Sequence, residues 1–216
     1  MSELLLIETV PVTALAQNAR IVHAPGGGDA LLIDPGGDAE LLSQRLDALQ
    51  LVPRAIWLTH SHFDHCGGVA DLKMRWPLRL YGHAAGRELR TSVVEYCTMF
   101  GVPAEEVRNC PEPDEYVSQG ARLSFAGFDF EVLYTPGHSP DHVCFYCPRA
   151  KVVFTGDVLF AGSIGRSDFP GGSGSQLMRS IKQQLLRLPG DTKVFAGHGP
   201  DTVIKREIDS NPFLQE

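Results

Sequence analysis

Basic residues are scarce in this sequence and never gather into a run. The chain carries 19 lysines and arginines against 26 aspartates and glutamates, which gives a formal net charge of -7. Proteins that bind nucleic acid contact its phosphates through clustered lysine and arginine, so we expect no nucleic-acid partner. No apolar segment approaches the length that a membrane-spanning helix needs, so we expect no membrane partner either.

Export signals and paired cysteines are also missing. Residues 1–8 place acidic residues on both sides of a very short apolar run, and they lack the basic n-region of a signal peptide. Five cysteines, an odd number, indicate thiols in a reducing compartment rather than a disulfide framework. We therefore predict a soluble protein of the cytoplasm.

The chain has 216 residues, 43% of them hydrophobic, which is enough for a sizeable core, and we interpret residues 1–216 as a single domain. Short apolar runs predict strands at Leu4–Val10, Ala19–Ala24, Ala30–Ile33, Ala55–Leu58, Leu78–Tyr81, Arg122–Phe125, Phe128–Tyr134, Val143–Tyr146, Val152–Phe154 and Lys193–Phe195. Helices are predicted after a capping Asp38, at Val69–Arg75, at Ala84–Phe100, and around Leu177, Ile181, Leu185 and Leu188. The proline-rich stretch Gly101–Tyr116 predicts a loop.

The most informative stretch is Thr59–Gly68, which holds three histidines and one aspartate within six positions. Imidazole and carboxylate groups suit zinc, iron and manganese. His60 and His62 are two residues apart, so an extended backbone points both rings the same way. Asp64 and His65 are adjacent and aim elsewhere in a turn. A lone histidine on a polar loop is usually a surface residue, but this group predicts a site, and one segment can supply two metal sites.

Three more candidate ligands follow other apolar runs, each directly after a glycine: His138, Asp157 and His198. Residues at the ends of several strands of one sheet converge on one spot, which is where α/β folds usually place their chemistry. The preceding glycine lets the backbone turn sharply there. The two strand-rich halves, each closed by helices, predict two sheets face to face with helices outside, a fold of the α/β or α+β class.

The ordered set H-x-H-x-D-H, Pro136-Gly137-His138, Thr155-Gly156-Asp157 and Gly197-His198 resembles the motifs of the metallo-β-lactamase superfamily over nearly the whole chain. The resemblance implies a four-layer αββα sandwich with its site along the edge between the sheets. It also implies that Asp34 supports the histidine cluster from behind the ligands.

Transferred position by position, the resemblance implies two divalent metal ions. The resemblance assigns His60, His62 and His138 to one ion. It assigns Asp64, His65 and His198 to the other, and it makes Asp157 the carboxylate that bridges both. A hydroxide held between two cations about 3.5–4 Å apart is a nucleophile near neutral pH. Zinc is the expected metal, with iron or manganese as alternatives.

Within the superfamily the chain most resembles the glyoxalase II type, the hydroxyacylglutathione hydrolases, in Thr155–Gly162 and in its Asn-Pro-Phe-Leu tail. The Gly165–Pro170 loop is similar to that of short bacterial glyoxalase II-like proteins, and the chain lacks the C-terminal helical region that grips glutathione. Arg166 is a candidate to bind a substrate carboxylate bidentately, whereas Asp168 cannot replace the tyrosine hydroxyl of the larger enzymes. We therefore expect the substrate to be a small-molecule thioester, with S-D-lactoylglutathione as the type case. Thioester hydrolysis is better supported than glutathione as the thiol part of that substrate.

The implied mechanism is attack on the thioester carbonyl by a metal-bridging hydroxide, which Asp64 orients as well as binding metal. Persulfide dioxygenases are the rival interpretation, with one iron held by His60, His138 and Asp157. Those enzymes typically show Ala-His-Asp-Tyr at the last motif, where this chain has Gly-His-Gly-Pro, and this difference favours the hydrolase. A non-enzymatic metal-binding protein would be expected to have lost ligands, and all seven are present.

The remaining histidines receive structural interpretations. His23 is predicted to be a surface or core-packing residue, and His142 to support the ligands or to be structural. His83 is predicted to be structural, with a place at the rim of a pocket as the alternative. A set of apolar residues is interpreted as the buried face of a helix, with a pocket wall as the alternative: Tyr96, Met99 and Phe100.

Among the cysteines, Cys144 and Cys147 share one predicted strand and point to opposite faces, which argues against a metal knuckle or a redox pair. Cys66 lies beside the ligands in sequence, and core packing and a place near the metals are equally favoured. Monomer and homodimer both stay open.

Overall fold

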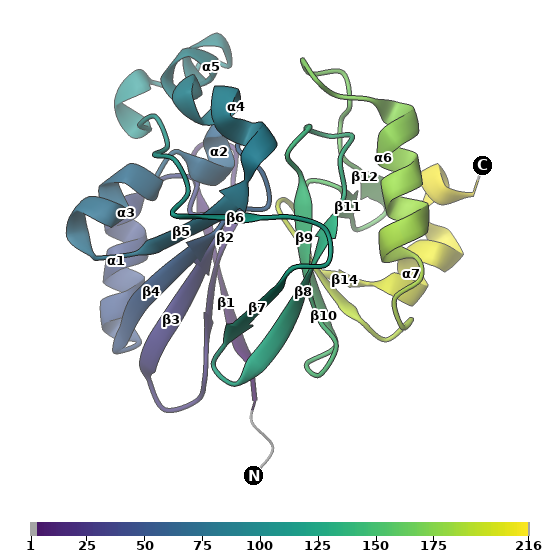
Figure 1. The fold of residues 1–216 in the computed structure, drawn as a ribbon, viewed down its shortest axis with the longest axis horizontal. Helices are drawn as coiled ribbons and strands as arrows, with labels where there is room; N and C mark the ends of the chain where they lie inside the picture. Colours follow the sequence, from purple (N-terminus) through teal and green to yellow (C-terminus); the bar gives the residue numbers. More distant parts are fainter. Residues whose placement is uncertain (1–3, 216) are drawn as a thin grey trace.

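The computed structural model describes residues 4–215; residues 1–3, part of the segment considered for an export signal, lie outside them, as does Glu216. Two six-stranded sheets face each other, and helices cover the outer face of each (Figure 1). The chain thus adopts the four-layer αββα arrangement that its motifs imply. Among the described residues no helix is both long and apolar enough to cross a bilayer.

The first sheet follows chain order, β1-β2-β3-β4-β5-β6. Its strands span Leu6–Val12, Gln17–His23, Gly28–Ile33, Leu51–Trp57, Arg79–His83 and Glu115–Val117. The strands from β3 to β6 are parallel, so each connection must cross back over the sheet. The crossovers carry the helices of the outer layer: α1 (Ala39–Ala48), α2 (Phe63–Cys66), α3 (Val69–Arg75), α4 (Arg87–Thr91) and α5 (Val93–Met99).

The second sheet has the order β14-β13-β10-β9-β8-β7. Its strands span Thr202–Val203, Lys193–Ala196, Val152–Gly156, Val143–Cys147, Phe128–Tyr134 and Arg122–Phe125. A small hairpin, β11 (Leu159–Phe160) and β12 (Ser163–Ile164), follows β10. Helix α6 (Gly174–Ser180) continues as a π-helical turn, Ile181–Leu185, and with α7 (Ile204–Ser210) it covers the outer face.

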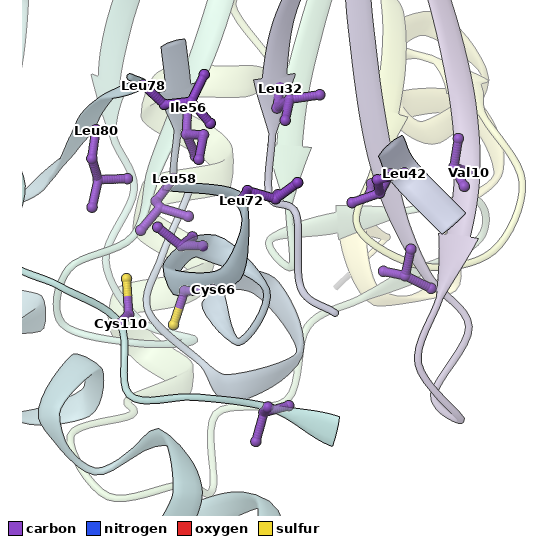
Figure 2. Close-up of a cluster of buried hydrophobic side chains, with 14 of the residues drawn as sticks. Val10, Leu32, Leu42, Ile56, Leu58, Cys66, Leu72, Leu78, Leu80 and Cys110 are labelled. Atoms are coloured by element: carbon purple, nitrogen blue, oxygen red, sulfur yellow. The ribbon is translucent and has the colours of Figure 1, made fainter. Parts of the chain in front are cut away.

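Three apolar layers hold the four structural layers together. Between the sheets, Trp57 packs against Phe130 and Phe145, with ring centroids 5.1 Å away in each case. The outer layer of the first sheet is filled by aliphatic side chains from strands and helices, such as Leu42 and Leu72 (Figure 2), together with cysteines and Phe63. Leu177 of α6 belongs to the corresponding apolar layer between the second sheet and the helices that cover it. Alternate strand residues therefore serve different layers, as period-two geometry requires.

The elements differ from the sequence predictions at Asp38, at Ala84–Phe100 and at Gly101–Tyr116, among other places. Asp38 precedes α1 but has left-handed backbone (φ 47°), and its carboxylate accepts a hydrogen bond from the Thr13 N–H instead of capping the helix. The single helix predicted over Ala84–Phe100 is a 3-10 turn followed by α4 and α5, which break at Ser92. The loop predicted at Gly101–Tyr116 holds a 3-10 turn, Ala104–Glu106, and the start of β6.

The break between α4 and α5 has a long-range cause. The Cys110 N–H donates to the Arg90 carbonyl, and the Asn109 side chain accepts from the Val94 N–H. The loop after α5 therefore satisfies backbone groups that a continuous helix would have paired internally.

All five cysteines are buried, and none forms a disulfide. Cys66 packs in the apolar layer beside Cys110 (Figure 2), and its thiol donates to the Ser61 carbonyl. Cys144 and Cys147 belong to the layers on opposite sides of β9, which confirms that they do not form a pair. Burial raises the pKa of the Cys66 thiol well above its usual range, and that of Cys144 to about 12.

We expect the native protein to show no fast-reacting thiol toward a colorimetric disulfide reagent at about pH 8, because all five thiols are buried out of the reagent's reach. After unfolding in guanidinium chloride, all five should react. Stoichiometric reaction of even one thiol before unfolding would contradict the burial described here.

Candidate metal centre

The side chains predicted as metal ligands all lie at one edge of the sandwich, where strands of both sheets end. His60 and His62 follow β4, and Asp64 and His65 lie on α2 directly after them. The other three each follow a strand of the second sheet: His138 after β8, Asp157 after β10 and His198 after β13.

One group consists of His60, His62 and His138. The Nδ1 atom of His62 lies 3.1 Å from Nε2 of His60 and 2.9 Å from Nε2 of His138. The Arg166 carbonyl can only accept, so His138 carries its hydrogen on Nδ1, 2.7 Å from that oxygen. This leaves the Nε2 lone pair of His138 directed at the other two rings.

The second group consists of Asp64, His65 and His198. The Nε2 atom of His198 lies 3.1 Å from Oδ2 of Asp64, and Nε2 of His65 lies 3.9 Å from the same oxygen. Asp157 lies between the two groups. Its Oδ1 is 3.3 Å from Nε2 of His65, and its Oδ2 is 3.6 Å from Nε2 of both His138 and His198.

Asp34 explains how two of these imidazoles are oriented. Its carboxylate accepts from the Thr59 N–H at 2.7 Å, from the Thr59 hydroxyl at 2.5 Å and from Nδ1–H of His65 at 3.0 Å. Because the Thr59 hydroxyl gives its hydrogen to Asp34, it accepts from Nδ1–H of His60 at 3.1 Å. Both histidines thus present a bare Nε2, the arrangement that hydrogen-bonded metal-binding histidines share.

The donor set fits divalent cations. Among the described residues, Nε2 of His65 and Oδ1 of Asp157 are buried without a hydrogen-bond partner, although they face each other. Two electron pairs at that distance repel unless a proton or a cation lies between them. Burial, followed by repulsion from His138, lowers the pKa of His62 to about 3, and burial likewise lowers the pKa of His60. Both rings are therefore neutral near pH 7, the form that binds metal.

His142 supports the site from behind without belonging to either group. Its Nε2 accepts a hydrogen bond from the Asp157 N–H at 3.1 Å, its Nδ1 lies 3.0 Å from the Thr135 hydroxyl, and its ring stacks on His60. This confirms the supporting role predicted for it. His83 stacks on Tyr134 and is not among the described residues that line the cavity beside the ligands, so the pocket-rim alternative is wrong.

Comparison with known proteins agrees with this geometry. The profile of the Metallo-beta-lactamase superfamily matches residues 12–198, a range that contains every candidate ligand. The chain belongs to the metallo-beta-lactamase superfamily. It is therefore a member of a superfamily of metal-dependent hydrolases.

The superfamily relatives cover essentially the same length. The chain is 42% identical over 210 residues to hydroxyacylglutathione hydrolase GloC of Haemophilus influenzae, which covers 96% of this chain and 97% of that protein. The BLEG-1 B3 metallo-beta-lactamase structure matches with a TM-score of 0.90 and 37% identity, covering 98% of this chain and 100% of the other. A di-iron-bound form of TTHA1623 matches with a TM-score of 0.87 and 40% identity, covering 96% and 100%. These matches confirm the superfamily fold.

A buried polar network behind the histidines has no counterpart in the sequence predictions. Ser61, between His60 and His62, donates to Asp141 at 2.6 Å and accepts from the fully buried Arg90 at 3.2 Å. Arg90 also donates to the His83 carbonyl at 3.0 Å. The network anchors the segment between the two ligands to α4, and no local motif could have revealed it because its members come from three distant parts of the chain.

The loop that carries His198 is held from the opposite sheet. The Asn18 side chain on β2 donates to the carbonyls of Ala196 at 3.1 Å and Gly199 at 2.9 Å. Arg20, also on β2, donates to the Ala196 carbonyl at 2.8 Å and pairs with Asp201. The position of His198 in the second ligand group therefore depends on both sheets.

A cavity of about 630 Å³ opens beside both ligand groups, within the usual size range of ligand sites. Tyr96, Met99 and Phe100 line it, as the alternative of a pocket wall has it. Tyr96 also packs against the apolar layer of the first sheet, as the helix-face interpretation has it, whereas Met99 and Phe100 are exposed. Arg166 lines it as well, but its guanidinium already forms a bidentate pair with Asp168, at 3.0 and 2.8 Å. Substrate binding by Arg166 stays a prediction.

Proposed function

We propose that this protein is a metal-dependent thioester hydrolase of the glyoxalase II type. The observation that carries the proposal is the pair of ligand groups that share Asp157 and open onto one cavity. The Haemophilus influenzae relative is named a hydroxyacylglutathione hydrolase, which supports the same reaction class.

In this proposal His60, His62 and His138 would hold one ion, Asp64, His65 and His198 would hold the other, and Asp157 would serve both. Bound divalent cations, zinc first and iron or manganese as alternatives, supply Lewis acidity for a carbonyl and lower the pKa of water. Each group then offers three nitrogen or oxygen donors, and the shared carboxylate adds a fourth, which leaves room for water and substrate.

The chain's own residues contribute orientation and exclusion of solvent. Asp64 is buried, and its Oδ2, 3.1 Å from Nε2 of His198, belongs to the second ligand group, so its Oδ1 is the oxygen that would accept a hydrogen bond from the attacking water. Gly165 has no side chain, and a Cβ there would lie 1.8 Å from the Asp157 carbonyl oxygen. Because Gly165 has no side chain, the loop can pass close to Asp157 and bring the Arg166 carbonyl to His138.

The test is elemental analysis of freshly purified protein, paired with hydrolysis of S-D-lactoylglutathione. We expect about two metal ions per chain and turnover that falls as a chelator removes them and returns when metal is restored. One iron per chain, no thioester hydrolysis and oxygen uptake with glutathione persulfide would replace the proposal with the dioxygenase. Hydrolysis of a chromogenic cephalosporin but of no thioester would replace it with a lactamase.

A further inference from the structure

The wall of the cavity nearest the first ligand group is aromatic. Phe169 lies 5.4 Å from the His62 ring and 5.9 Å from the His138 ring, measured between centroids. Phe100 contacts Phe169 at 5.8 Å and Phe63 at 5.6 Å, so the three phenylalanines form one continuous apolar surface. This surface, the phenylalanine wall, leads from the ligand nitrogens out toward α5.

The outer end of the phenylalanine wall stays uncovered. Met99 and Phe100 lie at the C-terminal end of α5, where their side chains are 74% and 48% exposed, and both line the cavity. Tyr96 precedes them by one helical turn, so all three share one helix face. An exposed apolar surface at the mouth of a reactive site indicates a ligand that covers it.

Charges that would recognise a polar peptide are missing from the same cavity. Among the described residues that line it, Arg166 alone carries a lysine or arginine cation. Asp168 accepts from Nε and Nη2 of this guanidinium, which lies 4.5 Å over the Phe169 ring. The glutathione portion of a thioester brings two carboxylates, and the described lining outside the ligand groups offers them no lysine or arginine besides this paired Arg166.

We propose that the preferred substrates are thioesters of apolar acyl groups about six to eight carbons long, with the acyl chain on the phenylalanine wall. This inference rests on the proposed function and narrows its substrate class. Water adds to the carbonyl carbon, the carbon–sulfur bond breaks, and the sulfur leaves with the bonding electron pair and takes up a proton. The products are a carboxylic acid, which ionises at neutral pH, and a thiol.

The experiment uses metal-loaded enzyme with S-acyl-N-acetylcysteamine thioesters from acetyl to octanoyl, compared with S-D-lactoylglutathione. Each methylene buried on the wall should raise kcat/KM by about threefold, so hexanoyl should exceed acetyl by roughly thirtyfold to a hundredfold. Hexanoyl should also exceed S-D-lactoylglutathione. A flat dependence on chain length, or faster turnover of S-D-lactoylglutathione, would overturn the inference and leave the thioesterase intact. Failure to hydrolyse any of these thioesters would instead remove the proposed function itself.

A matched pair of substitutions tests the position of the acyl chain. Met99→Glu places a charge at the outer end of the phenylalanine wall, and we expect the hexanoyl-to-acetyl ratio of kcat/KM to fall roughly tenfold. Met74→Glu is the control, because Met74 is 72% exposed on α3 and does not line the cavity within the described chain. Its ratio should equal that of the unmodified protein. An unchanged ratio in the Met99→Glu variant would show that the chain does not lie there.

Discussion

The Asp157→Asn variant is expected to lose thioester hydrolysis by on the order of a thousandfold in kcat/KM. Asp157 places its carboxylate against members of both groups, through Oδ1 to His65 and through Oδ2 to His138 and His198. Asparagine keeps the size of the side chain but removes its charge and replaces one acceptor oxygen with a donor. In the proposed site, the amide could no longer serve two cations at once.

Metal content separates this explanation from simple damage to the fold. Asp157→Asn should retain fewer metal ions than the unmodified protein at the same free metal concentration, while its circular dichroism spectrum stays the same. Asp191→Asn is a suitable control, because Asp191 is an exposed aspartate paired with Lys151 outside the site. Near-normal activity of Asp157→Asn with both ions retained would contradict the shared role assigned to Asp157.

The candidate ligands could be picked out from sequence because most of them follow a strand end within a few residues. Strand ends are local features, and apolar runs stopping at glycine or threonine marked β8, β10 and β13 correctly. The supporting role of His142 was also predictable, because the two ligand groups were already complete without it. The layer order followed from the alternation of strands and helices.

The residues that escaped prediction act over long distances or have an ambiguous pattern. Tyr96, Met99 and Phe100 show the spacing of a helix face, and that spacing is the same whether the face meets the core or a cavity. Arg90 was missed because an arginine on a short helix is usually exposed, and only the fold brings it to Ser61. The break after α4 depends on Cys110, which is distant in sequence from the carbonyl it binds.

Glycines at the back of the site show most clearly how the ligands and the fold depend on each other. A Cβ at Gly36 would lie 1.4 Å from the Asp64 carbonyl oxygen, and one at Gly68 would lie 2.8 Å from the Pro35 carbonyl oxygen. The Gly68 N–H donates to that same Pro35 carbonyl at 3.1 Å. The loop after β3 and the end of α2 therefore interlock backbone against backbone, which places Asp64 and His65 over Asp34.

Gly36→Ala should consequently lower the free energy of unfolding by at least about 4 kcal/mol, because neither backbone segment can move without displacing a ligand. Gly174→Ala is the matched control: at the start of α6 its new methyl would meet only the Ser167 hydroxyl, at 3.2 Å, and stability should change by no more than about 1 kcal/mol. Denaturant unfolding followed by circular dichroism measures the stability of both variants. If Gly36→Ala does not accumulate as folded protein, the soluble fraction of each variant on expression is compared instead. If Gly36→Ala were as stable as the control and bound metal normally, the interlocked loops could not be what holds Asp64 in place.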